Sequence, residues 1–442
     1  MSGTIAPALA LEHELIDLLG AHAVSTEPRV RERASVDGAP MSPILAARLP
    51  LGLADLVVFA ADAQQIATAV AAAVRHGVPA TVRGRGTGNY GQGIPRHGGL
   101  VIDTTRAKAI THVGDGAITA EAGAPMISLE QAAAATGQEL WMYPSTVQST
   151  VGGFLSGGSG GTGSIAHGSN DRGFVVALDV VHADGTDAIV HVEGEDALGY
   201  VHNYGTAGVI VRATVRLEPA RDWRGMYASF PTFAGTRQVL QTIGALEPAP
   251  RLVSGDNPQI SAALPPDEAI PQDRSSLRII LDAAQTREAT RIIEEAGGRV
   301  EAVREGPQAS MRISMLSYNH PIEWYQKSQP HPVFHLEVSG MPLTENAPAV
   351  EAVYPGGLLH LESTREHPIG MLAAPYVDEE TVAAGIDALT ALGVGVHSPH
   401  QWNVDFRVDE TVALAARTDP RGLLNPGKLD PTYAGARKGA IR

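Results

Sequence analysis

The most informative segment of this chain reads Arg83-Gly-Arg-Gly-Thr-Gly-Asn-Tyr-Gly-Gln92. Residues 86–91 satisfy the G-x-G-x-x-G pattern of Rossmann dinucleotide sites, but that pattern must open a helix whose N-terminus faces the pyrophosphate. Here the predicted helix, capped by Asp62 and ended by Gly77, precedes the glycines, and a predicted strand at residues 100–103 follows them. The context therefore excludes a Rossmann site. It also excludes a P-loop, because no G-K-[ST] ending follows.

Successive glycines can bind an anion without a helix, because consecutive backbone N–H groups curve around the anion and form a nest. The first glycine loop, residues 83–93, has this character, and Arg83 and Arg85 would add positive charge beside it. A glycine-rich hairpin without a ligand is the alternative, and short glycine motifs taken alone favour that alternative.

The second glycine segment, residues 150–168, favours a bound ligand over a hairpin without one. Eight of its 19 residues are glycine, so we predict that it does not form regular core structure. A packed domain tolerates such a run where another group approaches the backbone closely. A flexible linker is the alternative, but predicted apolar strands flank the segment on both sides. Two glycine nests suit a dinucleotide that lies extended between two subdomains.

Composition narrows the function classes. The chain has 442 residues, enough for two or three domains, and its formal net charge of −15 argues against a nucleic-acid partner. It contains no cysteine, which excludes disulfides, cysteine-ligated zinc, iron–sulfur clusters and a cysteinyl flavin link. No apolar stretch approaches the ~20 residues needed to span a bilayer, and no basic region begins the chain. We therefore expect a cytoplasmic enzyme with no membrane partner.

Seven weak motifs follow one another in the order and spacing of a known family. They are Arg83-Gly-Arg-Gly-Thr-Gly88, Gly99-Leu-Val-Ile-Asp103, Glu121-Ala-Gly123, Pro144-Ser-Thr146, Thr150-Val-Gly-Gly153, Val180-Val-His-Ala-Asp-Gly185 and Leu424-Asn-Pro-Gly-Lys428. In these motifs the sequence resembles the FAD-linked oxidases of the vanillyl-alcohol oxidase and p-cresol methylhydroxylase (PCMH) superfamily. The resemblance covers residues 30–220 and returns at residues 406–430.

The resemblance implies an α+β fold. A PCMH-type FAD-binding domain of two subdomains would occupy residues 1–220, an α+β cap domain residues 221–405, and a C-terminal segment, residues 406–442, would return to the FAD-binding domain. The first loop would bind the FAD pyrophosphate, the second segment would run along the pyrophosphate and the isoalloxazine, and residues 209–210 would lie near the adenine. The predicted cofactor-binding residues are Arg83, Gly84, Arg85, Gly86, Thr87, Gly88, Asn89, Gln92, Pro144, Ser145, Thr146, Thr150, Gly152, Gly153, Gly157, Gly160, Gly163, Ser164, His167, Val209, Ile210, Asn425 and Lys428.

The same resemblance predicts that FAD is held noncovalently. Many relatives attach FAD through a histidine in the first loop, and Thr87 occupies that position here. Relatives with two covalent links also use a cysteine, which this chain lacks.

Catalysis is expected in the cap, because residues 318–403 concentrate histidine, tyrosine and tryptophan. A flavin oxidase needs a base for the substrate proton, and histidine suits that role because its pKa lies near neutrality. Strand-like alternation places Val333, His335 and Glu337 on one face. Some relatives bind zinc with a pair of cap histidines, and His331, His335 and His400 could form a similar site here, but their spacing differs, so no metal is predicted. The predicted catalytic residues are His400, at the place of the relatives' late-cap histidine, and Tyr318 and His335, with His320, His360 and His397 as further candidates.

We therefore expect an FAD-dependent oxidase or dehydrogenase that transfers a hydride from a small hydroxyl-bearing substrate to flavin N5. O2 or another compound would be the electron acceptor, and a homodimer is compatible with the sequence. Two alternatives stay open. One is a flavin-dependent oxidative cyclase or desaturase of secondary metabolism, and the other is a flavin-binding protein without redox turnover.

Overall fold

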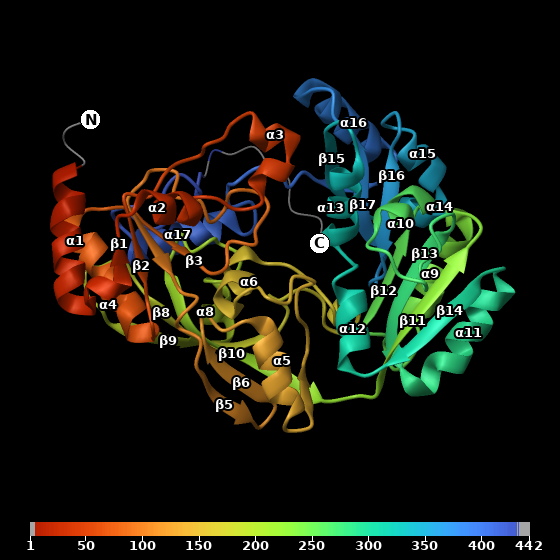
Figure 1. The fold of residues 1–442 in the computed structure, drawn as a ribbon, viewed down its shortest axis with the longest axis horizontal. Helices are drawn as coiled ribbons and strands as arrows, with labels where there is room; N and C mark the ends of the chain where they lie inside the picture. The colour runs from red at the N-terminus through yellow and green to blue at the C-terminus, as the bar shows by residue number, and fades with distance from the viewer. Residues whose placement is uncertain (1–4, 431, 433–442) are drawn as a thin grey trace.

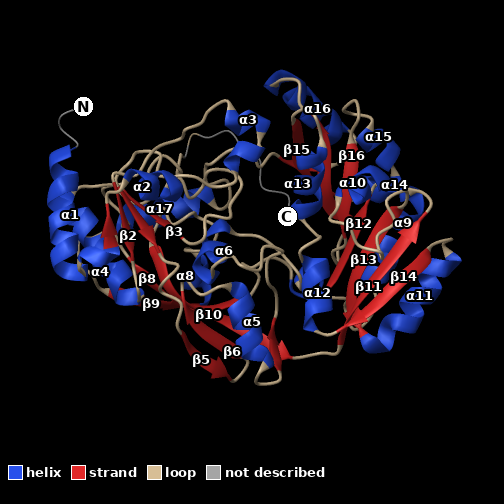
Figure 2. Ribbon diagram, in the orientation of Figure 1, coloured by secondary structure: helices blue, strands red, loops and turns tan. Residues whose placement is uncertain are grey.

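The computed structural model describes residues 5–430 and 432, and it contains both helices and sheets. Strands β1–β10 form one lobe and strands β11–β18 form the other, with helices on the outer surfaces of both (Figure 1; Figure 2). The predicted α+β class is confirmed. Among the described residues, no helix combines the length and apolar character needed to cross a membrane.

The first sheet, of order β1-β2-β4-β3, carries the first glycine loop at the end of β3. Helix α4 (Ala63–His76) joins β2 to β3, with the Asp62 carboxylate accepting the Gln65 N–H at its start and Gly77 in the left-handed region at its end, as predicted. Its apolar face packs on the sheet beside α1 (Ile5–Leu19). The strands are β1 (Val24–Ser25), β2 (Leu56–Phe59), β3 (Ala80–Arg83) and β4 (Leu100–Asp103).

No helix opens after the first glycine loop: residues 84–99 form turns that lead directly into β4. The exclusion of a Rossmann site is therefore confirmed. The chain before β2 contributes two short helices, α2 (Pro28–Ala34) and α3 (Pro43–Ala46).

The second sheet, of order β5-β6-β10-β8-β9 with β7 paired to β10, completes this lobe. The second glycine segment is more regular than predicted. Thr150 caps α6 (Val151–Gly157) by accepting the Gly153 N–H, and α7 (Ser164–His167) follows, so a good N-cap offsets the cost of glycine in a short helix. The other elements are β5 (Ile110–Gly114), β6 (Ala117–Glu121), α5 (Met126–Ala134), β7 (Gln138–Leu140), β8 (Val175–Val181), β9 (Ile189–Glu193), α8 (Gly194–Leu198) and β10 (Val209–Pro219).

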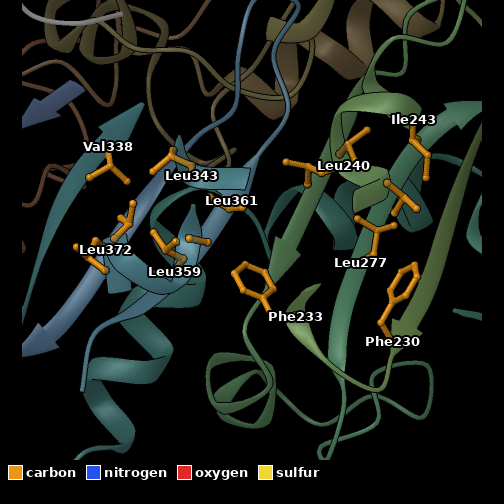
Figure 3. Close-up of a cluster of buried hydrophobic side chains, with 14 of the residues drawn as sticks. Phe230, Phe233, Leu240, Ile243, Leu277, Val338, Leu343, Leu359, Leu361 and Leu372 are labelled. Carbon is orange, nitrogen blue, oxygen red and sulfur yellow. The ribbon is translucent and has the colours of Figure 1, made fainter. Parts of the chain in front are cut away.

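The second lobe is built on an antiparallel sheet of order β14-β11-β13-β12-β16-β17-β15-β18. Alternate residues such as Leu277, Leu361 and Leu372 point to one face and form the largest core with the covering helices (Figure 3). The strands are β11 (Trp223–Phe230), β12 (Leu252–Asp256), β13 (Ser275–Asp282), β14 (Arg299–Glu305), β15 (Val333–Ser339), β16 (Leu358–Glu362), β17 (Ile369–Pro375) and β18 (Gly395–His397).

The two faces of this sheet have different partners. The apolar face is covered by α9 (Phe233–Gly244), α11 (Thr286–Glu295), α14 (Pro342–Glu345), α15 (Ala347–Glu351) and α16 (Glu379–Ala391). The opposite face packs on α10 (Pro258–Ala263), α12 (Pro307–Ser314) and α13 (Asn319–Ser328). This second face is turned toward the first lobe (Figure 1) and is partly polar.

The C-terminal chain returns to the first sheet. After α17 (Val408–Thr418), the Leu423 carbonyl accepts the Ala80 N–H and the Asn425 N–H donates to the Ala80 carbonyl, both at 2.8 Å. The turn that contains the Leu424-Asn-Pro-Gly-Lys428 motif therefore lies directly behind the first glycine loop. The rest of the predicted C-terminal segment, apart from residue 432, lies outside the described residues beyond residue 430.

Candidate active site

A cavity of about 770 Å³ lies between the two lobes, and both glycine segments line it. This volume falls in the range of roughly 300–1,000 Å³ that is typical of small-molecule and cofactor sites. Of the predicted cofactor-binding residues, all line the cavity except Gly163, Asn425 and Lys428. Residues scattered from 83 to 210 in the sequence thus meet around one space.

In the first glycine loop, the two arginines behave differently. Arg83 turns back into the protein, where its Nη1 donates to the Ala34 and Val36 carbonyls at 2.5 and 2.9 Å. Arg85 is exposed and makes no hydrogen bond or ion pair with any described residue. Arg85 is therefore the loop cation available to an anionic ligand, whereas Arg83 holds the loop in place.

Side chains of the same loop tie the two lobes together. The Asn89 amide donates to Glu323 on α13 at 2.9 Å, and Tyr90 hydrogen-bonds His335 on β15 at 2.9 Å. Thr87, at the position where relatives carry a histidine, lies 3.0 Å from the Ser149 hydroxyl. Asn89 thus joins the loop to the cap across the cavity wall.

The glycines of the second segment have two different roles. A Cβ built on Gly157 meets no atom within 4 Å, so backbone faces open space at this part of the cavity wall. A Cβ on Gly163 would lie 2.0 Å from the Trp141 carbonyl oxygen, and Gly163 has φ of +109°. Gly163 is therefore needed for backbone packing, which explains its place outside the lining.

Asn425 and Lys428 lie outside the cavity lining and hydrogen-bond backbone carbonyls of the first loop. The Asn425 amide donates to the Gln92 and Tyr204 carbonyls, both at 2.9 Å, and the buried Lys428 ammonium donates to the Gly91 carbonyl. Burial lowers the pKa of Lys428 to about 7, although the nearby Asp37 carboxylate opposes the shift. Both residues act on the loop and not on a ligand in the cavity.

The cap contributes a row of side chains that crosses five strands. Backbone register aligns Asp256 with His360, His360 with Met371, Met371 with Glu337, and Glu337 with His397. Residues directly opposite one another in antiparallel strands share a face of the sheet. All members of this cap row except Asp256 line the cavity. The prediction that alternation in β15 places His335 and Glu337 on one face is confirmed, because Phe334, Leu336 and Val338 enter the opposite core.

At one end of the cap row, His397 lies between two carboxylates. Its Nδ1 is 2.8 Å from Glu337 and its Nε2 is 2.6 Å from Asp405. Burial acts to lower the pKa of His397, but the two carboxylates outweigh burial and raise it to about 10. His397 is therefore an imidazolium at neutral pH that donates both of its N–H groups.

At the other end of the row, His360 has a similar environment but is fully buried. Its Nδ1 is 2.6 Å from Asp256 and its Nε2 is 3.0 Å from Glu362. Burial opposes protonation here too, and the two carboxylates raise the pKa of His360 to about 9. Arg278, also fully buried, pairs with Asp256 at 2.5 Å.

Tyr318 connects this network to the second glycine segment. Its N–H donates to Glu362 at 2.7 Å, and its hydroxyl donates to the Gly161 carbonyl at 2.5 Å. Its φ of +54° is rarely adopted by a bulky residue, so these contacts hold a strained backbone. Burial raises the pKa of the Tyr318 phenol far above its ordinary value, so the geometry favours Tyr318 as a donor and not as a base.

His400 and His335, the other predicted catalytic residues, do not line the cavity. His400 Nε2 lies 2.6 Å from the His335 carbonyl and its Nδ1 lies 2.9 Å from the Ser42 hydroxyl, so both ring nitrogens bond protein groups. Burial lowers the pKa of His400 to about 4 and also lowers that of His335. The geometry disfavours both residues as the base, because neither faces the space that a substrate would occupy. His320 also lies off the lining, with its two nitrogens near Thr146 and the Met315 carbonyl.

The carboxylates of Glu337, Glu362 and Asp405 were not among the predicted site residues. The alternation of β15 and β16 carried the signal for Glu337 and Glu362, since each is two residues from a candidate histidine in a strand. No local pattern marks Asp405. The metal prediction is not tested by this geometry, although the described residues contain no cluster of three or more metal-ligating side chains with suitable geometry.

Comparisons with known proteins identify similar chains and similar folds. Residues 54–190 match the family described as FAD binding domain. The glycolate oxidase subunit GlcD of Bacillus subtilis is 25% identical over 448 residues, which cover 85% of this chain and 88% of that protein. The D-lactate dehydrogenase of Archaeoglobus fulgidus is 30% identical over 186 residues, which cover 40% and 42% of the two chains. An alkyldihydroxyacetonephosphate synthase structure has the same fold, with a TM-score of 0.76, 17% identity, and coverage of 95% of this chain and 85% of that one.

The cavity, the two glycine segments and the family match together define an FAD-binding flavoprotein with a PCMH-type fold. An FAD-linked oxidoreductase of Mycobacterium tuberculosis is 27% identical over 250 residues, and with the family match it supports an FAD-dependent oxidoreductase. The family match and these relatives support membership of the superfamily of FAD-linked oxidases.

Proposed function

We propose that this protein oxidises a small hydroxyl-bearing molecule by transferring a hydride to noncovalently bound FAD. One observation carries the proposal: a single cavity is lined by the two glycine segments on one side and by the cap row, with its paired histidines and carboxylates, on the other. A cofactor and a substrate placed in this cavity would therefore meet between the two lobes.

The residues present fit a dinucleotide. The exposed, unpaired guanidinium of Arg85 offers N–H donors and charge to a pyrophosphate, the open space at Gly157 leaves room for a ligand against the backbone, and Thr87 offers no histidine for a covalent link. We propose that the two glycine segments hold FAD and that residues 1–220 act as the FAD-binding domain beneath a cap of residues 221–405. When bound, FAD supplies the acceptor for two electrons.

The substrate hydroxyl must lose a proton as its C–H bond is oxidised. His397 is already protonated, so it is a donor at neutral pH and not the base. Glu337 is the better acceptor, because it lines the cavity, its side chain is 41% exposed, and its Oε1 has no hydrogen-bond partner among the described residues. We propose that Glu337 accepts the hydroxyl proton and that His397 positions the Glu337 carboxylate.

Two measurements test the core of the proposal. The purified protein should show flavin absorption bands, and anaerobic addition of a substrate alcohol should bleach them in a stopped-flow experiment. A flavin that no alcohol or hydroxy acid reduces would contradict the proposed hydride transfer and would favour a flavin-binding protein without redox turnover.

Noncovalent attachment has a separate test. Acid precipitation should leave all of the FAD in the supernatant, because Thr87 replaces the linking histidine and the sequence has no cysteine. Yellow colour that stays with the precipitate would contradict this and would point to a histidine or tyrosine link in the cap.

A further inference from the structure

We propose that the substrate of this enzyme is an uncharged alcohol and not a hydroxy acid, an inference that rests on the hydride transfer proposed above. The relatives named for glycolate and D-lactate act on carboxylates by their names. The cap face of this chain has a charge pattern that disfavours a carboxylate beside the reacting hydroxyl.

Every cation in the ion clusters of the cap row already has protein partners. His397 uses one ring nitrogen on Glu337 and the other on Asp405, and His360 uses its two on Asp256 and Glu362. The third cation of these clusters is the Arg278 guanidinium, which donates to the Leu316 carbonyl, Ser276 and Ser254 and pairs with Asp256. None of these groups is left to pair with a substrate anion.

The carboxylates outnumber the cations. The three cations face four carboxylates, those of Asp256, Glu337, Glu362 and Asp405, which leaves a net charge of −1. Loss of the proton from either histidine would only make the face more negative. An anionic substrate would lose its hydration shell beside groups of like charge. Both the lost hydration and the repulsion cost free energy in an environment of low dielectric constant. A hydroxyl group, by contrast, can donate to the free Oε1 of Glu337.

Other arginines that line the cavity do not change this balance. The Arg172 side chain is 55% exposed and lies 3.9 Å from Glu366, and the Arg365 side chain is 53% exposed and lies 3.1 Å from Glu247. Solvent screens such groups strongly. Arg85 belongs to the first glycine loop, where the FAD phosphates would engage it. The middle of the cap row is Met371, which supplies an apolar floor between the two histidine clusters.

The test uses the FAD-loaded full chain and matched pairs of compounds that differ only in a carboxylate versus a hydroxymethyl group. The pairs are glycolate with ethylene glycol, D-lactate with (R)-propane-1,2-diol, and D-gluconate with D-glucitol. Anaerobic flavin reduction is followed for each compound. We expect the uncharged member to have the larger second-order rate constant by roughly tenfold or more wherever a pair reacts.

The outcomes separate this inference from the proposed function. Faster reduction by the carboxylate members would overturn the inference and leave the proposed hydride transfer intact. If no compound reduces the flavin, the proposed hydride transfer fails, and binding of D-lactate and oxalate, read from the flavin absorption spectrum, decides the charge argument alone. Perturbation of the spectrum by either anion at millimolar concentration would then overturn that argument, and an unchanged spectrum would support it.

Discussion

At the scale of single residues, Glu337 is the group whose removal should affect chemistry most directly. Glu337→Gln keeps the shape and the hydrogen bond to His397 but removes the proton acceptor. We expect flavin reduction to slow by roughly 10²–10⁴, the usual contribution of a general base, with FAD content unchanged. Stopped-flow reduction by a reacting alcohol measures this effect.

Glu294→Gln is the matched control, since Glu294 is exposed on α11 and makes no ion pair with a described residue. His400→Ala supplies a second comparison, because His400 is buried off the cavity and should affect folding more than the rate. A large loss of rate in FAD-loaded His400→Ala with none in Glu337→Gln would return the base to His400.

Gly157 offers a test of where the cofactor lies. A side chain at Gly157 meets no protein atom within 4 Å and the backbone does not have positive φ, so Gly157→Leu should leave the fold of the apoprotein intact. The same side chain would project into the space that FAD is proposed to fill. We expect an unchanged melting temperature for the apoprotein and a loss of most FAD, read as the ratio of flavin to protein absorption.

Gly86→Val is the contrasting variant. Gly86 has φ of +65°, and its Cβ would collide with the Arg83 guanidinium, so both the loop and FAD binding should suffer. If Gly157→Leu retains full FAD, that part of α6 does not border the cofactor.

At the scale of elements, the C-terminal turn and the first glycine loop form one unit. Asn425→Ala would remove the amide donor from the Gln92 and Tyr204 carbonyls, and Lys428→Met would remove the ammonium donor from the Gly91 carbonyl, which would keep only the Ile94 N–H at 3.2 Å. An unsatisfied buried polar group costs about 1–3 kcal/mol. We expect both variants to bind FAD roughly tenfold or more weakly while the cap stays folded.

Equilibrium binding of FAD to the apoprotein measures this effect. Asp409→Asn, at an exposed position on α17, is the control. Wild-type FAD affinity in Asn425→Ala would show that the turn does not determine the conformation of the loop.

At the scale of the whole molecule, the buried ion clusters couple stability to pH. The folded-state pKa of His397, about 10, and that of His360, about 9, lie above the ordinary histidine value. Their stabilisation is therefore complete below about pH 6.5 and is lost as the pH rises through 9 to 10. Lys428 acts in the opposite sense, because its folded pKa of about 7 is below the ordinary value and stability from this residue rises between pH 7 and 10.

His397→Gln separates these contributions. At pH 7 the variant should melt at a lower temperature than wild type. Each kcal/mol of lost stability lowers the melting temperature of a 150–250-residue domain by about 2–4 °C. The difference between the two proteins should shrink toward pH 10. Thermal melts across this pH range, with the exposed His112→Gln as control, measure the effect. Equal melting temperatures for wild type and His397→Gln at every pH would show that the His397 cluster does not stabilise the protein.

The sequence by itself determined the α+β class, the superfamily and the use of FAD, because these depend on local signals. The glycine runs, the capped helix before the first loop and the alternation of β15 are each visible within a few residues of chain. The predicted cofactor residues nearly all face one cavity, although their contacts with FAD stay a prediction.

Only the tertiary structure decided which cap residues face the cavity. Strand register brings His397 and Glu337 together, and a loop places Asp405 beside His397, whereas His400 is buried behind the cavity wall. Alternation tells which face of a strand a residue occupies, but not which strand lies beside it. The charge of a histidine is likewise set by its neighbours in space. His397 and His400 are only three residues apart in the sequence, yet their pKa values are about 10 and about 4. The sequence alone does not contain this difference.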